Sequence, residues 1–193
     1  MSKRSFFTLI FFAFQGGCGY TLRGNTRAFF DQHQIRTIYV NPVKNNSYKG
    51  GVEITVYNAL RKRIAQGGYV RIVDNPNQAD AQISSTVLDA SYVPSGITTT
   101  DQIAPVQTGP SNIQIASGYN VSLKVSFELF QFKEKKKVWS DTLLRQKTFS
   151  ASTYLGALGT TSALINESDF ERSISELAVS VVTDAEESIN SIF

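Results

Sequence analysis

The chain of 193 residues is 41% hydrophobic and 18% charged, which is enough apolar material for one domain with a single core. Its 19 basic and 16 acidic side chains give a net charge of +3. Two of the basic residues, Lys3 and Arg4, lie in a segment that we expect to be removed, which leaves 17 basic and 16 acidic residues, a net charge of +1. So small an excess gives no reason to expect nucleic acid as a partner.

The first 18 residues have the layout of an export signal. The two basic residues precede an apolar run, Phe6 to Phe14, that is shorter than the roughly 20 helical residues needed to cross a bilayer. Two glycines then precede Cys18, the only cysteine, which has no partner for an internal disulfide. We therefore predict a lipoprotein signal peptide over residues 1–17, cleaved before Cys18, which then carries a covalent lipid. An ordinary signal peptide with an incidental free cysteine and a buried N-terminal helix are the alternatives.

Residues 18–34 are predicted to form a lipidated tether, because the stretch 25–34 (NTRAFFDQHQ) has the character of a link between the lipid and the fold. Two or more acyl chains on Cys18 would anchor such a chain stably at a membrane, whereas one chain gives only marginal binding. Residues 35–193 are then expected to form a single domain.

The first half of that domain alternates short strands with one helix. Arg36–Val40 is predicted to be a strand ended by Asn-Pro, and residues 44–51 a loop. Apolar residues recur every four positions across residues 52–66, which predicts a helix with Gly67 at its C-terminal cap. Tyr69–Val73 is predicted to be a second strand.

The middle of the chain is predicted to be sheet. Residues 82–93 are rich in β-branched side chains, and residues 119–129 alternate strictly between apolar and polar, so one face of that strand should be buried. Residues 133–137 (KEKKK) are predicted to be the turn into a partner strand, 138–150. The long insert 94–118, rich in Thr, Pro and Gly, is expected either to contact a partner or to be disordered.

A second amphipathic helix is predicted at the C-terminus, starting near Ser168 or Asp169. Its apolar positions follow helical spacing; they are Phe170, Ile174, Leu177, Ala178, Val181, Ala185 and Ile189. The charge is uneven along the chain, because residues 166–193 carry seven acidic and one basic side chain and residues 18–75 carry nine basic and three acidic. The expected fold is an α+β two-layer sandwich, with two helices packed on one face of a mixed, mostly antiparallel sheet of four to five strands.

The residue inventory does not favour an enzyme. The only histidine, His33, lies in the predicted tether, and the only cysteine is expected to carry lipid. No His/Cys cluster has the spacing of a zinc site, and no serine has a supporting base and carboxylate pattern. We therefore expect no catalytic residue, no metal, and no cofactor beyond the covalent lipid on Cys18.

The segment CGYTLRG, residues 18–24, resembles the start of mature LptE proteins, the lipopolysaccharide-assembly lipoproteins of Gram-negative outer membranes. The matching residues after the acylated cysteine are Gly19, Tyr20, Leu22, Arg23 and Gly24. Further along, RTIYVNPVKN resembles the first strand of that family, and the later strands and C-terminal helix come in the expected order.

This resemblance implies a non-enzymatic lipoprotein that sits in the lumen of the outer-membrane barrel LptD, plugs it, and helps lipopolysaccharide reach the outer leaflet. An Asp directly after the acylated cysteine commonly retains lipoproteins at the inner membrane. This chain has Gly19 at that position, so the outer membrane is favoured. The alternative is a periplasm-facing lipoprotein scaffold of another envelope or secretion complex.

The turn at residues 133–137 is the candidate contact with lipopolysaccharide. Clustered ammonium groups attract phosphate, which lipopolysaccharide carries near its lipid. The turn offsets its lysines with a single acid, Glu134. The lysines are Lys133, Lys135, Lys136 and Lys137. The competing interpretation is a solvated hairpin tip whose charges prevent aggregation.

Overall fold

The computed structural model describes residues 25–95, 97–99, 114–116, 118–150, 154–155, 161–162 and 167–191. The predicted signal peptide, Cys18 and the motif from Gly19 to Gly24 lie outside these residues. The described helices are α2 (Asn25–Gln32), α3 (Val52–Gly67) and α5 (Glu167–Asn190), with a short 3-10 turn at Pro76–Gln78. None of these helices is both long enough and apolar enough to span a bilayer.

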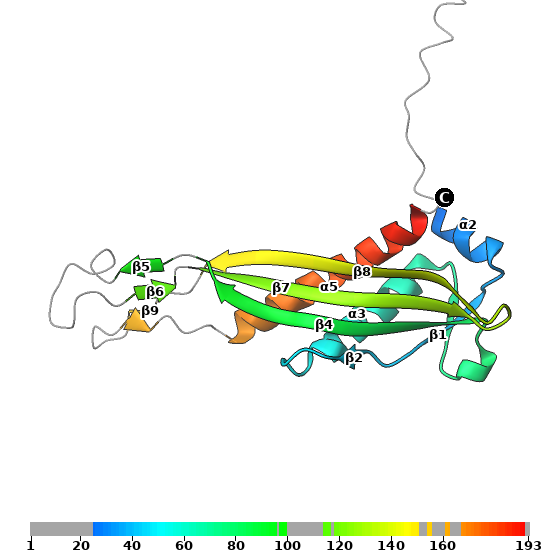
Figure 1. Cartoon of the computed structure of the whole chain (residues 1–193), viewed down its shortest axis with the longest axis horizontal. Helices are drawn as coiled ribbons and strands as arrows, with labels where there is room; N and C mark the ends of the chain where they lie inside the picture. The colour runs from blue at the N-terminus through cyan, green and yellow to red at the C-terminus, as the bar shows by residue number, and fades with distance from the viewer. Residues whose placement is uncertain are drawn as a thin grey trace, which may run out of the picture.

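The molecule has two layers: the helices form one, and a mixed sheet of six strands forms the other (Figure 1). Its strands run in the order β3-β1-β4-β7-β8, and β2 pairs with β4 off this path. The pairs β1–β3, β1–β4 and β2–β4 are parallel, whereas the long ladders β4–β7 and β7–β8 are antiparallel. The strand bounds are β1 Thr37–Val40, β2 Lys44–Asn45, β3 Arg71–Val73, β4 Ala81–Pro94, β7 Gly118–Gln131 and β8 Lys136–Ser150.

The alternating strand predicted at residues 119–129 is confirmed as the middle of β7. Its apolar residues are all buried; they are Tyr119, Val121, Leu123, Val125, Phe127 and Leu129. On the neighbouring strand β4, the inward positions change from odd to even numbers between Val87 and Ala90. The register shifts at that point, which identifies a β-bulge at Leu88, and the extra residue lets both halves of β4 keep an apolar inner face.

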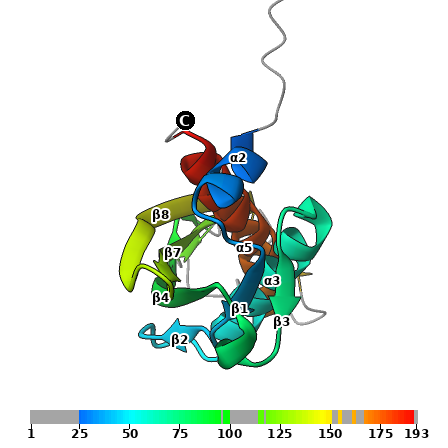
Figure 2. The ribbon, with the colours of Figure 1, turned by 90° about the vertical axis from the view of Figure 1, so that its right-hand side faces the viewer.

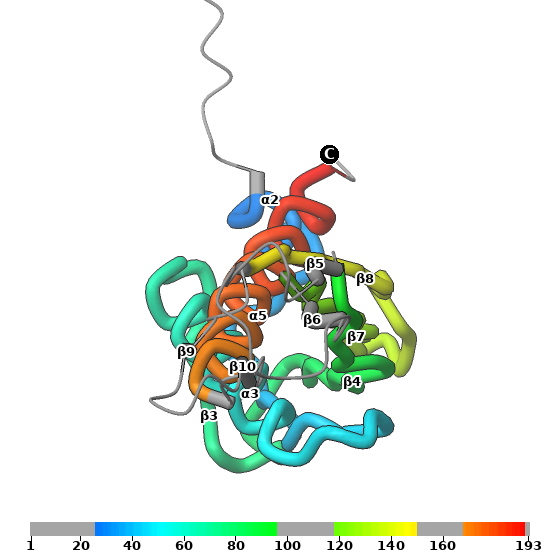
Figure 3. The backbone as a smooth tube through the Cα atoms, turned by 90° about the vertical axis from the view of Figure 1, so that its left-hand side faces the viewer, coloured from blue at the N-terminus to red at the C-terminus, as the bar shows by residue number. Residues whose placement is uncertain are grey.

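The helices lie together on one face of the sheet, as Figures 2 and 3 show from the two ends of the molecule. The helix predicted at 52–66 is confirmed as α3, although its C-terminal cap is Gly68 rather than Gly67, at φ 66°. All seven apolar positions predicted for the C-terminal helix are buried in α5. Helix α5 starts at Glu167, ahead of the predicted start near Ser168 or Asp169.

The expected α+β two-layer sandwich is confirmed, with one helix and one short strand more than predicted. The extra strand is β2, in the stretch predicted to be a loop. The insert 94–118 contributes the antiparallel pair β5 (Ile97–Thr99) and β6 (Gln114–Ala116), and β9 (Tyr154–Leu155) pairs with β10 (Thr161–Ser162); most of the insert lies outside the described residues.

The tether prediction is wrong for residues 25–34, because the additional helix α2 covers Asn25–Gln32. Phe29 is 1% exposed and Phe30 is 7% exposed, and both belong to the same apolar core as β1 and α5. A helix of eight residues is marginal in isolation, so α2 owes its stability to this burial rather than to its sequence propensity.

Truncating Phe29 tests the packing of α2. Phe29→Ala removes a fully buried ring, and we expect it to lower the free energy of unfolding by about 3–5 kcal/mol. Urea unfolding followed by circular dichroism measures the change. The matched control is Arg27→Ala on the same helix, whose side chain is 79% exposed and should shift stability little. Equal stability of the two variants would return residues 25–34 to the role of a tether.

Candidate functional site

The predicted basic turn is present as the tip of the β7–β8 hairpin, residues 132–137. The tip lies at the same end of the sheet as the end of α2 and the start of β1, opposite to β5 and β6 (Figure 1). Lys135 has a φ of 51°, in the left-handed region that a non-glycine residue rarely occupies, and this conformation closes the turn. The tip carries four lysines and one glutamate, a net charge of +3.

Three of the four predicted lysines have partners within the protein. Lys133 Nζ donates to Gln34 Oε1 at 2.6 Å, Lys136 pairs with Glu134 at 2.5 Å, and Lys137 pairs with Glu128 at 2.7 Å. The side chains of the two ion pairs, Lys136–Glu134 and Lys137–Glu128, are about half exposed. Ion pairs exposed to solvent contribute little free energy, so these lysines can exchange their partners for another anion. The Lys135 ammonium has no hydrogen bond or ion pair among the described residues.

The charge of the tip also acts on its single acid. A hydrogen bond from Lys136 holds the pKa of Glu134 below its usual range, and the nearby charges of His33 and Lys133 act in the same direction. The positive charges of the tip therefore favour the ionised form of Glu134.

Two polar residues that were not among the predicted site residues link the base of this tip to the rest of the fold, Gln131 through its side chain and Asp80 through its backbone carbonyl. Gln131 is 2% exposed, and its side-chain amide donates to the carbonyl of His33. Gln131 occupies the next inward position after Leu129, so a polar residue in an apolar row was the signal that could have identified it. The backbone N–H of Phe132 donates to the carbonyl of Asp80 at 2.9 Å.

Asp80 is the second of these residues, and it joins three segments. One of its carboxylate oxygens accepts from the backbone N–H of Arg36 at 2.9 Å, from the N–H of Thr37 at 2.8 Å and from the Thr37 hydroxyl at 2.9 Å. Burial raises the pKa of Asp80, but these hydrogen bonds favour the ionised form and lower the pKa overall. Residues 36, 80 and 132 are distant in sequence, so no local sequence pattern predicts the contacts of Asp80 with Arg36 and Phe132.

The Asp80 contacts predict a loss of stability on acidification. A carboxylate whose pKa is lower in the folded state stabilises the protein above the unfolded-state pKa of about 3.9, and this contribution disappears as the pH falls through the folded-state value. We expect Asp80→Asn to be less stable than the wild type by about 1–2 kcal/mol at pH 7 and to lose less stability below pH 4. Urea unfolding over a pH series measures both effects. Exposed Asp31→Asn is the control, and identical pH profiles for wild type and Asp80→Asn would contradict this role.

The acidic C-terminal segment pairs with basic residues of the same chain. Glu176, Ser180, Asp184 and Ser188 recur every four residues on α5 and form one stripe. Within it Glu176 pairs with Lys147 and Asp184 with Arg145, both on β8. The Ser188 hydroxyl donates to Asp141, and Glu186 pairs with Arg63 of α3. The acidic C-terminal segment is therefore linked to basic residues of β8 and, through Arg63, to the basic stretch at residues 18–75.

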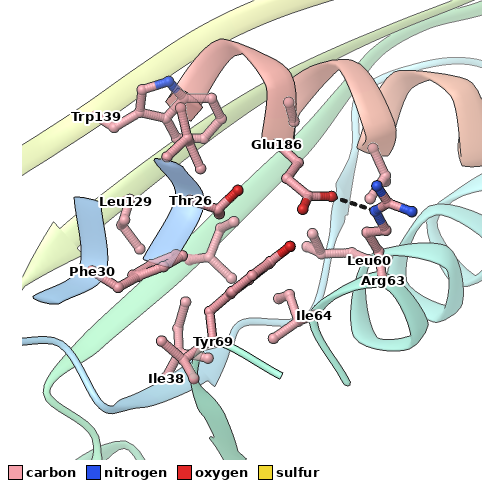
Figure 4. A pocket seen from close by; sticks show the side chains of 15 residues that line it. Thr26, Phe30, Ile38, Leu60, Arg63, Ile64, Tyr69, Leu129, Trp139 and Glu186 are labelled. Carbon is pink, nitrogen blue, oxygen red and sulfur yellow. Dashed lines mark hydrogen bonds and ion pairs between the residues drawn. The ribbon is translucent and has the colours of Figure 1, made fainter. Parts of the chain in front are cut away.

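An apolar cavity of about 50 Å³ lies where α2, α3 and α5 meet the sheet. Figure 4 shows Phe30, Trp139 and Tyr69 around it, with the Arg63–Glu186 pair at its side. Its volume is well below the roughly 300–1,000 Å³ of typical small-molecule sites, so it cannot enclose a whole lipid. Among the described residues, no group of three or more His, Cys, Asp or Glu side chains has the arrangement of a metal site.

Comparisons with known proteins complete these observations. The sequence model of one family, described as LptE, lipopolysaccharide-assembly, matches residues 35–187. No curated protein matches the chain.

Solved structures that resemble this chain do so at low sequence identity. The PelC dodecamer from Paraburkholderia phytofirmans has 14% identity and a TM-score of 0.47, covering 80% of this chain and 86% of PelC. Rare lipoprotein B from Shewanella oneidensis has 14% identity and a TM-score of 0.43, covering 79% and 96%. A protein proposed as a neuraminyllactose-binding hemagglutinin homolog from Helicobacter pylori has 5% identity and a TM-score of 0.51, covering 79% and 84%. At this identity the last similarity supports the fold alone.

Proposed function

Because the chain belongs to the LptE family of lipopolysaccharide-assembly proteins, we propose that it is an outer-membrane lipoprotein that partners and plugs an LptD-type β-barrel. In this role it helps lipopolysaccharide reach the outer leaflet and catalyses no reaction. The observation that carries the proposal is the family match over residues 35–187, which includes every strand of the main sheet and most of α5.

The membrane address of this proposal depends on Cys18. Its place after a short apolar run and two glycines is typical of lipoprotein processing, and a diacylglyceryl group with an N-acyl chain would hold the domain stably at the membrane. The covalent lipid is the only prosthetic group that the proposal needs.

The open face of the sheet supports a polar partner. Within the described part of the chain no helix covers this face, which exposes Lys124, Glu128 and Leu144. Its strands also present a row of residues with hydroxyl groups to it. These residues are Ser84, Thr86, Ser122, Ser126, Ser140 and Thr142. The interior wall of an outer-membrane barrel is also polar, so such a face can hydrogen-bond it without burying unpaired groups. The insert 94–118, with its Thr, Gln, Ser and Asn side chains, is a second surface for the same wall.

An affinity pull-down from detergent-solubilised outer membranes, after growth in labelled palmitate, tests the proposal. We expect C-terminally tagged protein to carry the label and to recover a stoichiometric large β-barrel protein. Cys18→Ala should lose the label, which separates processing from binding. Recovery of the labelled protein with periplasmic partners instead would support the alternative, a lipoprotein scaffold of another envelope complex.

The basic tip is proposed as the lipopolysaccharide contact. Changing Lys135, Lys136 and Lys137 to Ser removes three charges that face solvent, so we expect weaker binding of lipopolysaccharide at an unchanged thermal midpoint. Binding to immobilised lipopolysaccharide and thermal unfolding measure the two effects.

The matched control for this variant changes three exposed lysines elsewhere, namely Lys44, Lys62 and Lys124, to Ser. It alters the net charge equally, so a purely non-specific attraction would weaken to the same extent in both variants. Unchanged affinity of the tip variant would remove the tip as the contact.

A further inference from the structure

We propose that the β7–β8 tip docks on the surface of the same leaflet that holds the lipid of Cys18, where its lysines contact the phosphates of anionic phospholipids. This inference rests on the anchor in the proposed function. It adds a second contact between the protein and the membrane, and it sets the orientation of the domain.

The first step is the length of chain between the lipid and the fold. Asn25 is already part of helix α2, so only residues 19–24 separate the helix from Cys18. Seven Cα-to-Cα steps at about 3.3–3.6 Å each span at most about 25 Å. A tether running from Cys18 to Gln34 would have allowed more than twice this distance. The packing of α2 therefore keeps the domain close to its membrane.

The second step is the link between α2 and the tip. The carbonyl of His33 and the side chain of Gln34, which follow α2 directly, accept hydrogen bonds from Gln131 and Lys133 of the hairpin. Helix α2 has eight residues, which is about 12 Å along its axis. The residue where the chain enters the fold and the basic tip therefore lie at one end of the molecule, as Figure 1 also shows.

The third step is the chemistry of the tip. Its net charge of +3 is complementary to an anionic surface. The Lys135 ammonium has no hydrogen bond or ion pair among the described residues, so it can bind a phosphate without losing another contact. The rings of Phe130 and Phe132 pack edge to face, 5.9 Å apart, and both side chains are partly exposed beside these lysines. Basic residues with neighbouring aromatic rings are typical of protein segments at a membrane surface. Attraction to anionic headgroups acts within about 10 Å at 0.1 M salt. The tip can therefore feel this attraction only if the chain between the lipid and the fold is short.

Lysine footprinting on the lipidated protein tests the docking without any substitution. The protein is reconstituted in nanodiscs of phosphatidylcholine alone or of phosphatidylcholine with phosphatidylglycerol, and amine acylation is followed at each lysine by mass spectrometry. We expect a several-fold loss of acylation at Lys135 and Lys136 in the anionic discs, and none at Lys44 or Lys124. Salt at 1 M, where the screening length is about 3 Å, should abolish the protection.

A variant that preserves the fold sharpens the test. Lys135→Gly removes one charge at a position whose φ of 51° glycine adopts without strain, so the turn should be retained. We expect weaker protection of Lys136 in anionic discs. The control is Lys124→Ala, which removes one exposed charge from the middle of β7 and should leave the protection intact.

The outcomes separate this inference from the proposed function. Protein that enters the discs but shows equal acylation in both lipids overturns the docking and leaves the anchor in place. Protection by added lipopolysaccharide but not by phosphatidylglycerol also overturns the docking, and supports the lipopolysaccharide contact instead. Protein that fails to enter the discs overturns the Cys18 anchor, and the docking with it.

Discussion

Strand β7 buries one complete face beneath helix α5, and this burial determines how the other strands pair with it. Val121, Leu123, Val125 and Phe127 are fully buried, and each fully buried side chain of this size contributes about 1.5–3 kcal/mol relative to an exposed one. Because strand side chains alternate, a slip of one residue against β4 or β8 would place this whole row in water. The register of the two long ladders follows from that cost, and so does the bulge that keeps β4 aligned on both sides of Leu88.

Helix α5 carries two stripes of side chains, one apolar and one polar. Its apolar stripe covers β7, and its polar stripe meets charged residues that β8 directs toward the helix. Arg145 and Lys147 lie on the inner side of an edge strand, where inward charges also discourage pairing with another chain. Three of the seven acidic side chains of residues 166–193, namely Glu176, Asp184 and Glu186, are thus paired within the fold. The hairpin tip carries a net charge of +3.

Helix α2 belongs to the folded domain and is not a tether leading into it. Its sequence is short and mostly polar, and only tertiary contacts of Phe29, Phe30 and Ile35 with the core make it part of the domain. This packing places the start of the described chain at the basic end of the sheet. Helix α2 and the tip therefore lie at one end of an elongated molecule, and β5 and β6 lie at the other (Figure 1).

Sequence periodicity was enough to predict the alternating strand β7, its partner β8, helices α3 and α5, and their combination into an α+β sandwich. The sequence also located the lysines of the tip and the lipoprotein motif, because these are contiguous patterns. Three features became visible only in the folded chain: α2 is a helix, Gln131 and the carbonyl of Asp80 hold the base of the tip, and three of the four tip lysines have partners. The physical reason is that periodicity reports which face of a segment is buried, whereas these contacts join residues up to about a hundred positions apart, which become neighbours only when the sheet forms.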